Sequence, residues 1–138
     1  MVGDFSDEEV YVYEYDAVNN FTNNQTIIYT GCTSIEGVSI TNDHQWLVVG
    51  CNNGSIKVYT RSGSDFSEKQ LILKRSNLEW VTISHDHELL IVGSEGAAFV
   101  DIYKYDGADF IHNQTISGPT AHQRIFLTYD KEYLVIPN

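Results

Sequence analysis

The segment SHDHE brings together four side chains that could bind a metal ion: His85, Asp86, His87 and Glu88. Imidazoles and carboxylates are common ligands of zinc and other divalent metals in proteins. The segment, however, has the polar composition of a turn, in which successive side chains diverge. The related segments TNDHQ and TYDKE repeat the pattern with other residues, and His44 occupies the place of His87. We therefore expect a structural turn, with no bound metal and no cofactor.

Other catalytic signatures are missing from the sequence. There is no strand–turn–helix nucleophile motif, and neither cysteine has a histidine beside it. The segments GCNNG and GSEG do not match a phosphate-binding loop. The acidic run DFSDEE at residues 4–9 fits no cation-binding loop closely and is expected to be a solvated connection. The sequence thus favours a protein that is not an enzyme.

Four asparagines stand in the Asn-x-Ser/Thr pattern of N-linked glycosylation: Asn20, Asn24, Asn53 and Asn113. Asn24 and Asn113 both belong to a segment NQTI. We expect all four to be exposed, where a glycan does not disturb packing. The pattern favours a glycosylated extracellular or cell-surface protein, and a cytoplasmic protein rich in Asn and Thr is the alternative.

These residues belong to a repeat of 43 to 46 residues that runs through the chain. The segment VTISHDHELLIVGSEGAAFVDIYKYDGADFIHNQTI matches VSITNDHQWLVVGCNNGSIKVYTRSGSDFSEKQLI, and partial copies occupy residues 10–27 and 125–138. Three sets of residues share repeat positions: Tyr13, Tyr59 and Tyr103; Phe21, Phe66 and Phe110; Asp43, Asp86 and Asp130. A period of this length with several short strands per copy is typical of a β-propeller blade.

Each copy contains four strand-like runs. The first, at 38–41, 81–84 and 125–128, leads through a polar turn into a continuous apolar run, WLVVG, LLIVG or YLVIP. The third alternates, as in IKVYTR, so that aliphatic residues share one face and tyrosine the other. The fourth is more polar, ends in QTII, QLIL or QTIS, and suits an outermost strand. We predict an all-β fold of three four-stranded antiparallel blade-equivalents, with the turn aspartates bonding amides two residues on.

The two cysteines flank the first hairpin of one copy. Cys32 precedes the first run and Cys51 directly follows the second. Antiparallel pairing brings these ends close together, which makes a disulfide between Cys32 and Cys51 geometrically reasonable. Two small buried thiols are the alternative. A disulfide would agree with an extracellular location.

The repeat resembles the WD-repeat and YVTN-type β-propeller families over almost the whole chain. The matching features are the acid of the first turn, Gly50 and Gly93 at the end of the second run, and the aliphatic-x-aliphatic-aromatic third run. The pairs Val58–Tyr59 and Ile102–Tyr103 stand where WD repeats carry Trp-Asp, and of the Gly-His pair before the first run only His122 is left. The resemblance implies an architecture, which does not by itself name a function.

The resemblance also implies where an enzyme of this fold would hold a metal. Propeller hydrolases and lactonases place metal-binding carboxylates in the central channel, at the starts of the inner strands. Here Glu36, Glu79 and Gln123 hold those positions and do not form an evident set. A lactonase-type or other hydrolase is therefore the alternative function, and a carbohydrate-binding propeller is a further one.

The copies begin and end at the same point of the repeat. MVG at the start matches VVG at the end of a second run, and the last residues LVIPN belong to that run too. We treat residues 1–138 as a single propeller segment, with blade-equivalents at about 1–50, 51–93 and 94–138. Propellers have roughly four to eight blades, so three would leave apolar faces bare. The expected partners are further blades of the same chain, or identical subunits joined head to tail in a ring or filament.

The net charge of the chain limits the classes of partner that it can bind. A net charge of −11, from 19 acidic and 8 basic residues, argues against nucleic acid, because phosphate binding needs a basic stripe. There is no membrane-spanning run of about 18 apolar residues, and the acidic first residues show no signal-peptide pattern. The sequence therefore favours a non-catalytic scaffold or binding module of an extracellular protein.

Overall fold

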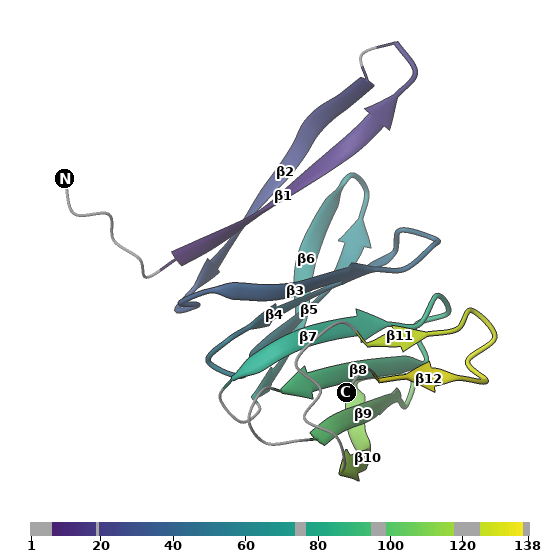
Figure 1. Ribbon diagram of the computed structural model, residues 1–138. Helices are drawn as coiled ribbons and strands as arrows, with labels where there is room; N and C mark the ends of the chain where they lie inside the picture. The colour runs from purple at the N-terminus through teal and green to yellow at the C-terminus, as the bar shows by residue number, and fades with distance from the viewer. Residues whose placement is uncertain (1–6, 19, 74–76, 95–98, 118–124, 137–138) are drawn as a thin grey trace.

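The computed structural model describes residues 7–18, 20–73, 77–94, 99–117 and 125–136. Twelve strands form within these ranges (Figure 1): β1 (Asp7–Asp16), β2 (Asn20–Thr30), β3 (Ile35–Ile40), β4 (Trp46–Cys51), β5 (Ser55–Ser62), β6 (Asp65–Leu73), β7 (Leu78–Ile83), β8 (Leu89–Ser94), β9 (Phe99–Tyr105), β10 (Phe110–Ser117), β11 (Phe126–Leu127) and β12 (Leu134–Val135). Across this part of the chain, no helix has the length and apolar character needed to cross a membrane.

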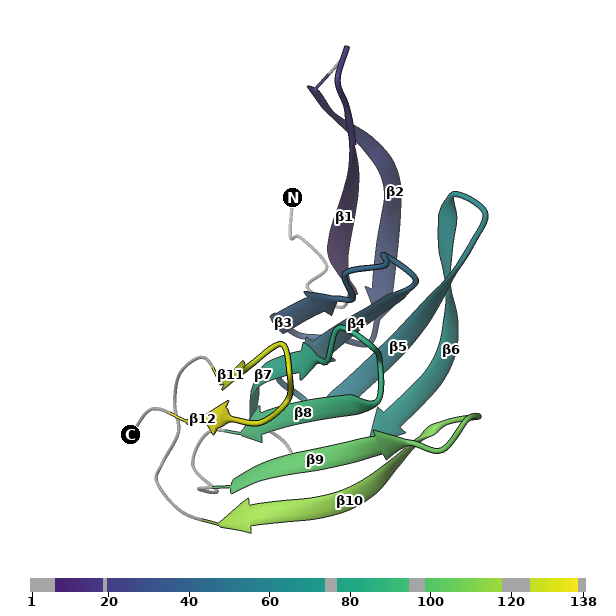
Figure 2. The same cartoon turned by 90° about the vertical axis from the view of Figure 1, so that its right-hand side faces the viewer.

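The strands form four antiparallel sheets. Two sheets have four strands each, in the orders β3-β4-β5-β6 and β7-β8-β9-β10, and two have only two strands, β1-β2 and β11-β12. The innermost strands β3, β7 and β11 follow one another on one side of the stack, and β6 and β10 lie on the other side (Figure 2). The prediction of an all-β fold with four-stranded antiparallel sheets is confirmed.

Apolar layers between successive sheets hold the stack together. Val48 and Val58 of one four-stranded sheet pack with Leu90 and Val92 of the next, and all four are fully buried. Tyr103 joins this layer, as Tyr59 joins the layer toward β1-β2. Tyr59 and Tyr103 are therefore packing anchors, as the sequence predicts, whereas the prediction is wrong for the equivalent Tyr13, which is 55% exposed. Burial of both sheet faces explains the continuous apolar runs.

Two glycines allow the two four-stranded sheets to approach each other closely. A Cβ atom on Gly37 of β3 would lie 2.8 Å from the main-chain nitrogen of Val81 in β7. A Cβ atom on Gly50 of β4 would lie 2.7 Å from side-chain carbons of Leu78 and Val81. Gly37 faces main chain and Gly50 faces side chains, and at both places a larger residue would push the sheets apart. The hydrogen bond from the Ile83 amide to Ser39 Oγ (3.1 Å) links the same two strands.

Candidate functional site

A hollow of about 200 Å³ lies where the innermost strands of three successive sheets end. It is lined from the end of β3 by Ile40 and Asn42, from the end of β7 by residues 82–85, and from β11 and its turn by residues 127–129. Each sheet contributes a short strand and the polar turn that follows it. The hollow therefore combines apolar side chains with imidazole, hydroxyl and amide groups, a combination that suits a small polar ligand.

Among the residues that line this hollow, His85 has the imidazole, which can act as a general acid and base. Its ring is half-exposed and stacks on the ring of Tyr129, with centroids 3.8 Å apart and planes inclined by 20°. Tyr129 comes from the next sheet and is itself 68% exposed, so the stack is a contact between two blades at the surface. Thr82 and Asn42 line the same hollow. An imidazole can both accept and donate a proton, which suits proton transfer in such a place.

His85 and His87 point to different parts of the molecule. The ring of His87 stacks on Trp46, 4.8 Å away and inclined by 14°, whereas His85 contacts Tyr129. The divergence expected for this turn is therefore confirmed. Glu36 is exposed on β3, Glu79 is half-buried on β7, and Gln123 lies outside the described residues. Within the described ranges, no three His, Cys, Asp or Glu side chains gather as a metal site would require, and we derive no step through a metal.

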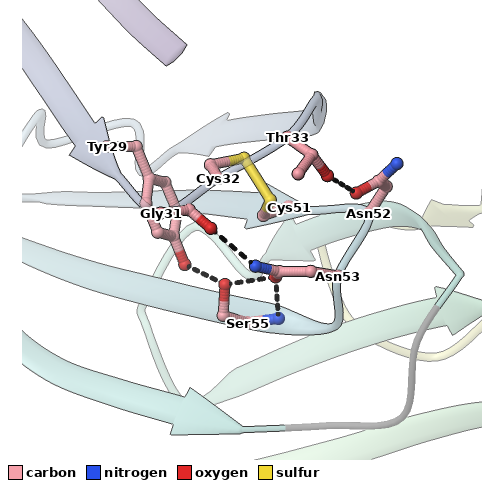
Figure 3. Close-up of a disulfide and its surroundings, with 8 residues drawn as sticks. All are labelled: Tyr29, Gly31, Cys32, Thr33, Cys51, Asn52, Asn53 and Ser55. Carbon is pink, nitrogen blue, oxygen red and sulfur yellow. Dashed lines mark hydrogen bonds between the residues drawn. A yellow bond between two sulfur atoms is a disulfide. The ribbon is translucent and has the colours of Figure 1, made fainter. Parts of the chain in front are cut away.

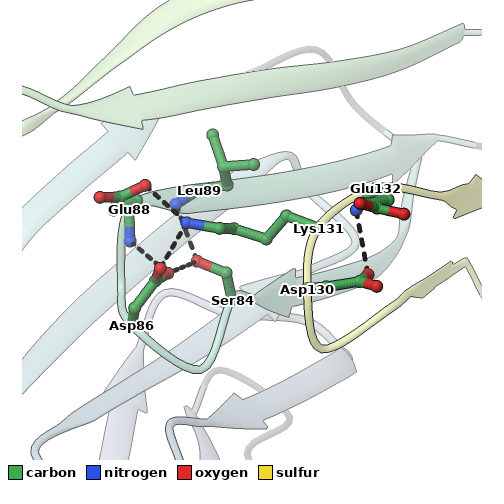
Figure 4. A network of polar contacts seen from close by, with 7 residues as sticks. All are labelled: Ser84, Asp86, Glu88, Leu89, Asp130, Lys131 and Glu132. Atoms are coloured by element: carbon green, nitrogen blue, oxygen red, sulfur yellow. Dashed lines mark hydrogen bonds and ion pairs between the residues drawn. The ribbon is translucent and has the colours of Figure 1, made fainter.

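The same hydrogen bonds hold the turn after each innermost strand. In the first turn, Thr41 Oγ1 donates to Asp43 Oδ1 (2.5 Å), which also accepts from the Gln45 amide (3.0 Å). The turns of Ser84–Asp86 and Thr128–Asp130 repeat both bonds. Figure 4 shows both bonds of Asp86 and the bond from the Glu132 amide to Asp130. The predicted structural aspartates, each bonding an amide two residues on, are confirmed. The turns hold the lining residues Asn42, His85 and Tyr129 in place.

A lysine connects two of these turns. Lys131 Nζ donates to Asp86 Oδ2 and, at 2.6 Å, to Glu88 Oε2 (Figure 4). Burial disfavours the charged form of Asp86, but hydrogen bonds from Lys131, Ser84 and the Glu88 amide outweigh it and hold the pKa of that carboxyl well below its usual range. Both acids raise the pKa of Lys131, through hydrogen bonds first. The only lysine beside the hollow in the described chain is thus already paired.

Acid is expected to weaken the turns. A hydrogen bond from Thr41 lowers the pKa of Asp43 and one from Thr128 lowers that of Asp130, so these carboxyls, like Asp86, bind protons less well in the folded state. Their contribution to stability is complete above the ordinary aspartate pKa of about 4 and is lost as pH falls through the lowered values. We expect the melting temperature to fall between roughly pH 5 and pH 2, and less steeply in Asp86→Asn. Equal slopes in the two proteins would contradict this account.

A second hollow, of about 330 Å³, lies between the β1-β2 hairpin and the sheet β3–β6. Its lining includes the aromatic rings of Tyr13, Phe21 and Phe66, and a loose ion pair of Arg61 with Glu14, 3.9 Å apart. Only two sheets form it, and its apolar wall residues other than Phe66 are at most partly buried. It is therefore a weaker candidate for catalysis than the hollow at the inner strands.

The structure joins Cys32 and Cys51 in a disulfide, with their Cα atoms 5.7 Å apart (Figure 3). Cys32 follows β2 and Cys51 ends β4, and both side chains are fully buried. Nearby, Asn53 Nδ2 donates to the Gly31 carbonyl (2.9 Å) and Asn53 Oδ1 accepts from the Ser55 amide (2.9 Å). The disulfide and the hydrogen bonds of Asn53 thus connect the segment between β2 and β3 to β4 and to the β4–β5 turn.

The asparagines predicted to carry glycans occupy different environments. Asn20, Asn53 and Asn113 are exposed. Asn24 is half-buried, and its Nδ2 donates to the Ser64 carbonyl of the neighbouring sheet at 2.8 Å. The expectation that all four are exposed is therefore wrong for Asn24, because the outer strand β2 packs along β6 at this point. Whether any of the four carries a glycan stays a prediction.

The fold of the chain is similar to that of several solved structures. The chain is similar to a candidate 6-phosphogluconolactonase from Bacteroides uniformis, with a TM-score of 0.73 at 14% identity over 93% of this chain and 43% of that one. A candidate 6-phosphogluconolactonase from Bacteroides fragilis gives a TM-score of 0.72 at 14% identity over 94% and 44%. Hydrazine synthase of Kuenenia stuttgartiensis gives 0.68 at 16% over 90% and 34%. The chain thus spans less than half the length of these proteins.

No protein-family model and no curated protein matches the sequence. The similarities to solved structures nevertheless correct one expectation. Two of the neighbours are named as candidate enzymes, so the inference that the chain is not an enzyme is wrong. That inference relied on missing motifs, and a propeller can build a site from residues that no local motif connects. The resemblance to WD-repeat and YVTN-type propellers is supported at the level of the fold: the chain folds as consecutive blades of a β-propeller.

Proposed function

We propose that this chain contributes the site of a propeller hydrolase that opens cyclic esters, at the hollow between β3, β7 and β11. The observation that carries the proposal is the placement of His85, whose imidazole stacks on Tyr129 in a hollow built by three successive sheets. The names of the Bacteroides neighbours support the same reaction class. We also propose that the chain is related to the WD-repeat or YVTN-type propellers, which its repeat resembles.

Hydrolysis of a lactone adds water across the ring C–O bond. The imidazole of His85 accepts a proton from water as the water oxygen attacks the carbonyl carbon. It returns a proton to the ring oxygen when the C–O bond breaks, and the product is an open-chain hydroxy acid. The Asn42 amide and the Thr82 hydroxyl, which line the hollow, can donate hydrogen bonds to the carbonyl oxygen as it becomes negative. The hydroxyls of Ser84 and Thr128 already donate to turn aspartates.

The charges around the hollow favour an uncharged lactone over a phosphorylated one. The turns beside it carry Asp86, Glu88, Asp130 and Glu132, and the chain has a net charge of −11. Lys131, the cation of these turns, is paired with Asp86 and Glu88. A phosphate group would meet mainly negative charge, and phosphate recognition requires a cation or main-chain donors directed at it. The proposed substrate class is therefore a neutral sugar lactone.

His85→Asn tests the proposal. Ring opening of glucono-δ-lactone, followed as acid release in a pH-stat above the spontaneous rate, should fall about 100- to 10,000-fold in kcat/KM, the usual contribution of an acid–base group. The same assay with 6-phosphogluconolactone should give a lower kcat/KM in the unmodified protein.

His44→Asn is the matched control. His44 lies in the equivalent turn of the preceding sheet, at a left-handed φ of 59° that asparagine tolerates, and it does not line the hollow. Its activity should match that of the unmodified protein. An unmodified protein that opens neither lactone, or a His85→Asn variant with full activity, would overturn the proposal.

We also propose that the protein works in an oxidising, extracellular setting and carries N-linked glycans. The buried Cys32–Cys51 pair and the exposed Asn20, Asn53 and Asn113 support this location. Treatment of the protein from its native source with an N-glycosidase should lower its mass by at least one glycan. An unchanged mass would remove glycosylation from the proposal.

A further inference from the structure

A glutamine in the outermost strand of one sheet clamps the main chain of the next sheet. Gln70 Nε2 of β6 donates to the Phe110 carbonyl at 3.1 Å, and the Phe110 amide donates to Gln70 Oε1 at 2.8 Å. Gln25 of β2 binds Phe66 in the same way, at 2.9 and 2.7 Å. Each amide side chain thus satisfies one N–H and one C=O on the outer edge of the neighbouring sheet. The clamp occurs at both junctions that β1–β10 form.

The repeat supplies a third glutamine and a third phenylalanine without this contact. Gln114 of β10 is the repeat equivalent of Gln25 and Gln70, and it is exposed. Phe21 of β2 is the equivalent of Phe66 and Phe110, yet 69% of its surface is exposed, compared with 6% and 2% for the other two. Gln114 therefore lies at one end of the stack and Phe21 at the other.

The two-stranded sheets at the two ends of the stack also complement each other, because each has the strands that the other lacks. In both four-stranded sheets the second strand pairs with the third: Val48 opposes Val58 in one and Ile91 opposes Ile102 in the other. The sheet β11-β12 has the first two strands of this arrangement, and β1-β2 has the last two. By repeat equivalence, Val135 of β12 is the counterpart of Val48, and Val12 of β1 is the counterpart of Val58.

The apolar faces at the two ends also correspond. Tyr59 and Tyr103 are buried against the preceding sheet, whereas their equivalent Tyr13 is 55% exposed. On the opposite end, Ile102 and Ile116 of β7–β10 are only partly buried under β11-β12. These two isoleucines are the equivalents of Val58 and Ile72, which receive Tyr103 and Phe110 at the junction between the four-stranded sheets. The same arrangement could thus receive Tyr13 and Phe21.

We propose that a second copy of this chain docks head to tail, so that its β1-β2 hairpin completes the sheet begun by β11-β12. Val135 then pairs with Val12 of the partner subunit, and Gln114 clamps the main chain of Phe21 of the partner subunit. One chain carries both halves of the contact, with the geometry of the two internal junctions. Such a contact is heterologous and extends to a closed ring or an open chain of copies. This inference does not depend on the proposed hydrolase activity.

Engineered cysteines test the register. Val12→Cys and Val135→Cys proteins, mixed and mildly oxidised, should give a cross-linked pair on non-reducing gels, and neither protein alone should do so. The native cysteines are paired with each other and do not compete. Val18→Cys is the control for accidental cross-linking, because Val18 is exposed at the β1–β2 turn and opposes nothing in the proposed sheet. Equal cross-linking with Val18→Cys, or within a single variant, would overturn the proposal.

The clamp is tested by its own variants. Native mass spectrometry of the unmodified chain should show dimers or larger species, with association strengthened by salt, because each copy carries a net charge of −11. Gln114→Ala should weaken association about tenfold or more by removing two hydrogen bonds, and leave the melting temperature of the single chain unchanged. Gln70→Ala, the matched control, should lower that melting temperature. A chain that stays monomeric at all concentrations, or associates equally well as Gln114→Ala, would show that other blades or no partner occupy this face.

Discussion

Replacing Phe110 by alanine is expected to lower the free energy of unfolding by about 3 to 5 kcal/mol. The ring is almost completely buried between the two four-stranded sheets, with its centroid 6.0 Å from that of Trp46 and 5.4 Å from that of Tyr105. Truncation removes this apolar contact and leaves a cavity that the rigid strands on both sides cannot fill. Urea unfolding, followed by tryptophan fluorescence, measures the change.

Phe21→Ala is the matched control, because the same residue type at the same repeat position is exposed. Its effect on the single chain should stay within about 0.5 kcal/mol. The measurement is made at a protein concentration low enough to exclude association, since the proposed docking would bury this ring. Similar losses for Phe21→Ala and Phe110→Ala would contradict the packing described here.

Loss of the Cys32–Cys51 disulfide is expected to cost about 3 kcal/mol. The two cysteines are 19 residues apart, and the bond restricts the unfolded chain over the whole of β3 and β4. The Cys32→Ala, Cys51→Ala double variant should therefore unfold at lower urea concentration than the unmodified protein.

A reducing agent separates the effect of the bond from that of the side chains. It should destabilise the unmodified protein by a similar amount and leave the double variant unchanged. If the double variant were as stable as the unmodified protein, the bond would not contribute to the fold, and the two buried thiols would act only as packing residues.

The sequence predicted the strands and their order within a blade because those features depend on local patterns. A sequence pattern depends on which faces of a strand are buried. This holds for the alternation around Val58 and Tyr59 and for the continuous apolar run at residues 46–50. The turn aspartates were also predictable, because Asp43, Asp86 and Asp130 bond amides only two residues away.

The contacts between sheets were not predictable in the same way. Gln70 reads as a polar residue of an outermost strand, and its bonds to Phe110 cross 40 residues of sequence. The signal that could have revealed it is the recurrence of glutamine at positions 25, 70 and 114 in a strand that otherwise varies.

The candidate site was missed for a related reason. In the sequence, His85 is a candidate only for a metal site, together with the residues next to it. In the structure its partner is Tyr129, which comes from a different sheet, and the hollow needs Asn42 from a third. A site assembled across blades leaves no local motif, and for this reason the absence of motifs did not justify the conclusion that the chain is not an enzyme.

The glutamine clamps recognise only main-chain atoms, an amide N–H and a carbonyl oxygen. This part of the join between blades is therefore independent of which side chain the clamped position carries, whereas the apolar layers still need matched side chains. A mutation at the clamped position does not require a compensating change of the glutamine, provided that the strand backbone is kept. The clamp thus allows the outer strands of a repeat protein to diversify while their contacts between blades are preserved.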